Sequence, residues 1–159
     1  MSPSIDYTGR TVDVLIFQGV VASGKQPIET GFGEAGYVCT GIQKVAQTWL
    51  ALFMTDRGSV LNKPTRGSSF FPAIRRGRIQ VENDVPAEFS LAAEHVRQTM
   101  ELDASQADPA LPDDERLDSA VLLEFNLFRE LAYLQLKIQI KSLAGDERVV
   151  YLPVPTAIR

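Results

Sequence analysis

The sequence predicts an α+β fold in which two to three helices pack on a small antiparallel sheet formed mainly by C-terminal strands. Two patterns of apolar residues predict it. Between residues 40 and 102, apolar residues recur at the i, i+3, i+4, i+7 spacing of one helical face. After residue 116, apolar and polar residues alternate instead, as they do in half-buried strands. Helices followed by strands along one chain are typical of the α+β class.

The composition is that of one globular domain. The chain has 159 residues, of which 45% are hydrophobic and 23% are charged. No apolar run approaches the roughly 18 residues that a membrane span needs, and the N-terminus does not resemble a signal peptide. We therefore expect a soluble, intracellular protein without a membrane partner. The net charge of −4 argues against general nucleic-acid binding.

Cysteine and histidine are scarce. The single Cys39 cannot form an internal disulfide, and one cysteine with one histidine cannot build a zinc cage. The sequence thus predicts no metal site and no cofactor.

Residues 1–39 form a distinct N-terminal part, with an arm, a strand over Thr11–Phe17 and a Gly-rich connection. The run from Gly19 to Lys25 has the spacing of a phosphate-binding P-loop. However, Gln26 stands where a Ser or Thr would bind Mg²⁺, and Pro27 follows it. A Gly-rich hairpin or loop is therefore favoured over a nucleotide site.

Residues 40–159 form the main domain, which opens with a helix. Its apolar face contains Ile42, Val45, Ala46, Trp49, Leu50 and Phe53. Thr40 and Gln43 fit a capping box at its start, and Gly58 fits the left-handed residue after its end. The segment from Lys63 to Gly67 contains Pro64, so it is expected to form a basic elbow rather than regular structure.

Two further helices and three strands follow. A short helix is predicted over Ser68–Arg76, ended by Gly77, and a long one from about Asn83 to Leu102. Within the long helix, His95 is interpreted as a structural residue. The alternating runs 117–127, Tyr133–Lys141 and Arg148–Val154 predict strands, the last ended or placed at an edge by Pro153 and Pro155.

Two features of this layout suit partner binding. Arg75, Arg76 and Arg78 could dock on an acidic partner, or they could be solvated surface charges. The C-terminal sheet should have an edge of unpaired backbone groups, which is either covered or used to recruit a strand from another chain. The acidic run from Glu101 to Asp118 is interpreted as a solvated loop.

Enzymatic activity finds little support. The carboxylates best placed for glycoside hydrolysis are Glu88, Glu94, Glu124 and Glu130, but no spacing fixes a catalytic pair among them. No Gly-x-Ser-x-Gly motif is present. We therefore expect no enzyme, and a muramidase-type glycoside hydrolase is the alternative.

The order of elements, together with the segment from Leu52 to Phe70, resembles the baseplate wedge proteins of contractile-tailed phages. This family is also called the sheath initiators, has relatives in type VI secretion baseplates and was once labelled lysozyme-like. The resemblance covers about residues 40–154. Where the family has a Glu-Pro-Arg signature, this chain has Lys63-Pro64-Thr65-Arg66-Gly67.

The resemblance implies a structural role in a phage tail baseplate, a virion component assembled in the host cytoplasm. Its partners would be other wedge proteins, the tail sheath protein and the hub or tube, with six copies per baseplate. The residues expected to dock on the wedge are Lys63, Pro64, Arg66, Gly67, Arg75, Arg76 and Arg78. Those expected in strand exchange with the sheath are Leu136, Ile138, Ile140, Val150 and Leu152.

Overall fold

The computed structural model describes residues 13–14, 17–18, 29–30 and 38–156. In the N-terminal part, β1 (Asp13–Val14) pairs with β4 (Val38–Cys39), and β2 (Phe17–Gln18) pairs with β3 (Glu29–Thr30), both antiparallel. The predicted strand over residues 11–17 thus contains β1 and the first residue of β2. The P-loop-like run from Gly19 to Lys25 lies outside the described residues.

Three helices follow, close to the predicted positions. They are α1 (Gly41–Met54), α2 (Phe70–Arg75) and α3 (Asp84–Ser105). Gly77 ends α2 as predicted: its φ is +68°, its N–H donates to the Ile74 carbonyl at 3.0 Å, and the Arg78 N–H donates to the Ala73 carbonyl at 2.9 Å. This pair of bonds is the Schellman arrangement.

Two predictions about the ends of α1 are wrong. Thr40 makes no side-chain cap bond; its hydroxyl donates instead to Glu115, which lies 75 residues further along the chain. The helix ends at Met54, with an extended Thr55 after it, before Gly58 is reached. Gly58, with φ +92°, belongs to the next turn, which the Ser59 N–H closes by donating to the Asp56 carbonyl at 3.0 Å.

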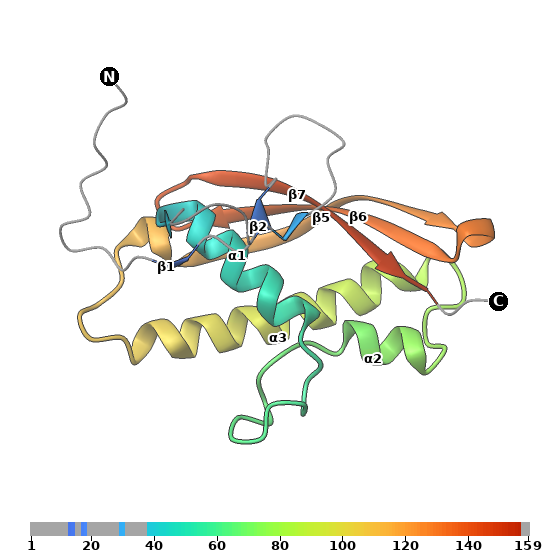
Figure 1. Cartoon of the computed structure of the whole chain (residues 1–159), viewed down its shortest axis with the longest axis horizontal. Helices are drawn as coiled ribbons and strands as arrows, with labels where there is room; N and C mark the ends of the chain where they lie inside the picture. Colours follow the sequence, from blue (N-terminus) through green and yellow to red (C-terminus); the bar gives the residue numbers. More distant parts are fainter. Residues whose placement is uncertain (1–12, 15–16, 19–28, 31–37, 157–159) are drawn as a thin grey trace.

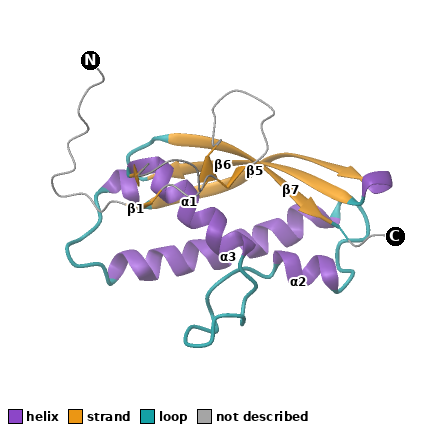
Figure 2. Cartoon of the chain, in the orientation of Figure 1, coloured by secondary structure: helices purple, strands orange, loops and turns teal. Residues whose placement is uncertain are grey.

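The C-terminal strands form one antiparallel sheet. Its members are β5 (Leu117–Phe128), β6 (Tyr133–Ser142) and β7 (Glu147–Pro155), in the order β5-β6-β7. Short 3₁₀ helices precede β5 (η1, Asp113–Glu115) and join β5 to β6 (η2, Arg129–Leu131). The predicted α+β class is confirmed, with the three helices packed against the sheet (Figures 1 and 2).

The core lies between the helices and one face of the sheet. Along β6, every second side chain is buried from Leu134 to Ser142, while those between are half-exposed. Helix α1 contacts β6 and β7, and α3 contacts β5. At the centre of the helical layer, Phe53 stacks on Trp49 with ring centroids 4.7 Å apart and also contacts Phe70 and Phe89. No described helix is long and apolar enough to cross a membrane.

Candidate partner-binding surfaces

The loop that joins α1 to α2, residues 55–69, projects away from the sheet on the helical side of the molecule (Figure 1). Its two ends are tied together at the base. The Ser68 N–H donates to the Thr55 carbonyl at 2.8 Å, and the Arg57 N–H donates to the Ser68 carbonyl at 2.9 Å. The buried Ser68 hydroxyl donates to the Phe53 carbonyl at 2.6 Å. The α1–α2 loop therefore leaves the domain from a closed, hydrogen-bonded neck.

Gly67 is required at this neck. Its φ is +100°, a conformation that side chains with a Cβ rarely adopt. A Cβ built there would lie 2.5 Å from the Thr55 carbonyl oxygen and 3.0 Å from the Asp56 carbonyl carbon. The two ends of the loop approach this closely only because residue 67 has no side chain.

Arginine side chains brace the α1–α2 loop against the helices. One end is held by Arg57, whose Nη1 lies 3.0 Å from His95 Nε2 on α3. The other end is held by Arg66, whose Nη1 lies 2.8 Å from Asp103 Oδ2, further along α3. Arg75 of α2 pairs with Asp56. The loop is thus attached to α3 through Arg57 and Arg66, and to α2 through Asp56.

These contacts change the interpretation of the predicted docking residues. Arg66 and Arg75 have carboxylate partners inside the chain, and Arg78 Nη2 lies 3.0 Å from Glu88 Oε1. Among the described residues, no ion pair forms for Lys63 or Arg76, and both side chains are exposed. Arg66 and Arg75 therefore brace the α1–α2 loop, whereas Arg78 joins the segment after α2 to α3.

The tip of the loop is apolar as well as basic. Leu61 is 97% exposed, and Lys63 and Pro64 are exposed beside it. A leucine this exposed gains free energy only by leaving water against another surface. No motif in the sequence singled out Leu61, because its exposure depends on how the loop is braced.

The Arg57–His95 contact makes stability depend on pH. Arginine only donates hydrogen bonds, so Nε2 of His95 accepts and the ring is neutral. Burial, and then the charge of Arg57, lower the pKa of His95 below its ordinary value of 6.5, although Glu94 acts in the opposite direction. Since the unfolded chain binds a proton more readily than the folded one, this contribution is complete above pH 6.5 and is lost as the pH falls below it.

Denaturant unfolding at pH 5 and pH 7.5 measures the contribution of His95 to this pH dependence. The free energy of unfolding should rise between the two pH values by more in the wild type than in His95→Gln, which keeps an acceptor for Arg57 but cannot be protonated. Equal rises in the two proteins would show that His95 carries no such linkage.

The residues predicted for strand exchange lie in the core. Leu136, Ile138 and Ile140 of β6, with Val150 and Leu152 of β7, are all buried and face the helices. In addition, β6 is the central strand, so its backbone pairs on both sides. Strand exchange at this sheet therefore has to use the backbone of an edge strand, β5 or β7.

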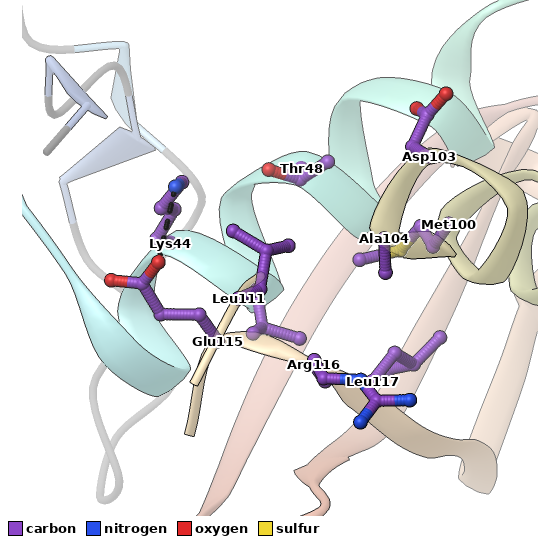
Figure 3. Close-up of a pocket in the computed structure, with 10 residues that line it drawn as sticks. Lys44, Thr48, Met100, Asp103, Ala104, Leu111, Glu115, Arg116 and Leu117 are labelled. Atoms are coloured by element: carbon purple, nitrogen blue, oxygen red, sulfur yellow. Dashed lines mark hydrogen bonds and ion pairs between the residues drawn. The ribbon is translucent and has the colours of Figure 1, made fainter. Parts of the chain in front are cut away.

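A small cavity lies between α1, the end of α3 and the segment before β5 (Figure 3). Its volume is about 120 Å³ and its lining is mainly apolar, including Val45, Met100 and Leu111. At its side, Lys44 Nζ lies 3.3 Å from Glu115 Oε2. Glu115 is only 5% exposed, so the prediction that the acidic run is a solvated loop is wrong at this residue. Glu115 attaches that run to the start of α1, because it accepts a hydrogen bond from the Thr40 hydroxyl and pairs with Lys44.

Two candidate surfaces remain, the tip of the α1–α2 loop and the edge of the sheet. Of the predicted docking residues, only Lys63 and Pro64 lie at the tip, and the side chains predicted for strand exchange are buried. Among the described residues, no cluster of His, Cys, Asp and Glu is arranged to hold a metal ion. No protein-family model matches the chain, and no curated protein matches it.

Proposed function

We propose that this protein is a structural component of a contractile phage tail baseplate. It is a wedge protein that templates sheath polymerisation by β-strand exchange with sheath subunits. The observation that carries the proposal is the placement of the two surfaces. The braced α1–α2 loop projects on the helical side, whereas the sheet forms the other layer (Figure 1). A protein that joins two assemblies needs two such separate contacts.

The loop suits attachment to the wedge. Both ends of the loop are fixed before any partner binds, because Arg57 and Arg66 contact α3 and Arg75 of α2 pairs with Asp56. Binding through a pre-organised segment avoids the cost of ordering that segment. Leu61 provides an apolar anchor and Lys63 a charge for an acidic neighbour. Six copies around the baseplate remain part of the proposal.

The alternative, a phage-type muramidase, is less consistent with the carboxylates. Hydrogen bonds from Arg97 and Gln98 lower the pKa of Glu94 to about 2, which is opposite to what a general acid needs. Glu124 Oε1 lies 2.7 Å from Lys137 Nζ, and Glu88 pairs with Arg78. Both carboxylates are thus engaged by a basic side chain of the same domain, and among the described residues no second carboxylate is paired with either of them as a hydrolase would need.

The test of the proposal is sheath assembly on baseplates prepared with and without this protein. We expect sheath subunits to polymerise only on baseplates that contain it, and adding the protein back should restore polymerisation. The proposal fails if sheath polymerises equally on baseplates that lack the protein. It also fails if the pure protein clears peptidoglycan suspensions and substitution of one glutamate abolishes the clearing.

Attachment to the wedge through the α1–α2 loop can be tested at Leu61. Leu61→Asp should weaken binding to baseplates that lack this protein by about 10- to 100-fold, the effect of losing one buried leucine side chain. Its thermal stability should not change, because Leu61 makes almost no contact within the chain. The matched control is Leu131→Asp, at a leucine that is also exposed but lies between β5 and β6. Equal binding by both variants would exclude Leu61 as an anchor.

A further inference from the structure

Strand β7 is an outer strand of the described sheet, and its hydrogen-bonding direction can be assigned residue by residue. At one end, the Ser142 N–H donates to the Asp146 carbonyl at 2.9 Å. At the other, the Thr156 N–H donates to the Ala132 carbonyl at 2.7 Å. The register between these points pairs Ile138 with Val150 and Leu136 with Leu152. Because hydrogen-bonded pairs alternate in antiparallel ladders, the even-numbered residues of β7 bond to β6.

The odd-numbered residues of β7 consequently direct their backbone groups away from β6. Two of them, Pro153 and Pro155, have no N–H to offer. The outward donors are therefore confined to Glu147, Val149 and Tyr151. Proline at these positions costs no bond to β6 and blocks the addition of another strand along the C-terminal half of the edge.

We propose that β7 accepts a strand only along Glu147–Tyr151, and that the added strand runs antiparallel to β7 and ends before Pro153. This inference rests on the proposed function, which makes the added strand a segment of a sheath subunit. The backbone groups of Val149 and Tyr151 form its ladder bonds. Pro153 and Pro155 determine where the added strand stops, and therefore how many residues of β7 it can pair with.

The faces of the sheet define both the direction and the composition of the added strand. The outer face carries Gln135, Lys137 and Gln139, whose side chains are half-exposed. Parallel sheets are normally buried on both faces, whereas antiparallel sheets tolerate one wet face, which favours antiparallel addition. On the inner face, the added strand continues the row formed by Val150 and Leu152. The partner segment is therefore short and alternates apolar with polar residues.

Paired variants at one position test the inference. Val149→Pro removes an outward N–H and leaves every bond to β6, whereas Val149→Ala keeps the N–H and removes only side-chain atoms. With baseplates carrying each variant and purified sheath subunits, we expect nucleation to fall about tenfold for Val149→Pro, the effect of one lost backbone bond. Val149→Ala should nucleate at the wild-type rate, and Pro153→Val, which adds a donor, should nucleate faster.

Normal nucleation by folded Val149→Pro would overturn the inference while leaving the proposed function intact. Normal nucleation without any copy of this protein would overturn both. If Val149→Pro does not fold, amide hydrogen exchange in the wild type decides. On addition of sheath subunits, the Val149 and Tyr151 amides should become protected, whereas those of Val150 and Leu152 should be protected beforehand. Unchanged exchange at Val149 and Tyr151 would overturn the inference.

Discussion

Gly67→Ala is expected to lower the free energy of unfolding by about 3 kcal/mol or more and to disorganise the α1–α2 loop. A non-glycine residue at this φ of +100° costs roughly 1–2 kcal/mol. The added Cβ would also meet the Thr55 carbonyl oxygen at 2.5 Å, which forces the neck open. Thermal unfolding measures the loss, and binding to baseplates that lack this protein measures the effect on the loop.

The control for this variant is Gly58→Ala in the same loop. Gly58 has a similar φ of +92°, but a Cβ there would have no atom within 4 Å. It should therefore cost only about 1–2 kcal/mol, the conformational term alone. The difference between the two variants isolates the close approach at the neck. Equal losses of stability would mean that the neck relaxes easily and does not position the loop.

Phe53→Ala is expected to have the largest effect on stability, about 3–5 kcal/mol. The Phe53 ring is completely buried and contacts Trp49, Phe70, Phe71 and Phe89. Its carbonyl also accepts the hydrogen bond from Ser68, so a shift of α1 here reaches the neck of the loop. At roughly 2–4 °C per kcal/mol, the melting temperature should fall on the order of 10 °C.

Phe128→Ala is the matched control for Phe53→Ala. Phe128 also stacks on an aromatic ring, with its centroid 4.6 Å from that of Tyr133, but it is 38% exposed. Its replacement should cost no more than about 1.5 kcal/mol, the range of an aromatic pair. A loss as large as that of Phe53→Ala would contradict the view that the aromatic cluster under the loop dominates the core.

Local periodicity was enough to predict the three helices and the three C-terminal strands, but not the short strands β2, β3 and β4. The stripe from Ile42 to Phe53 became α1, and the alternation from Tyr133 to Lys141 became β6. Both patterns reflect burial on one face, which is a property of neighbouring residues. Gly77 was also predictable, since the helix end and the left-handed residue lie next to each other in sequence.

Contacts between distant residues were not predictable in this way. Thr40 was expected to cap α1, but it bonds to Glu115 instead. Arg66 was expected to meet a partner, but Asp103 pairs with it within the chain. A charged side chain that lies in an exposed run and one that has a distant partner look the same in sequence. Pairing could be assigned only after the fold had brought α3 beside the α1–α2 loop.

The strand-exchange prediction shows the same limit. Sequence alternation identified Leu136 and Val150 correctly as one apolar face, but that face packs on the helices. Which strand lies at the edge depends on the order β5-β6-β7, and which backbone groups point outward depends on the register. Pro153 and Pro155 were expected either to end the last strand or to place it at an edge. Both lie within β7, which is an outer strand of the described sheet.

The most direct measurement of the central claim is an image of the native contractile particle, at a resolution that separates the strands of a sheet. We expect a ring of copies of this protein at the base of the sheath. The α1–α2 loop would lie against the wedge, and a sheath strand would pair antiparallel with Glu147–Tyr151. A particle in which this protein lies away from the sheath, or in which no sheath strand lies on β7, would contradict the account.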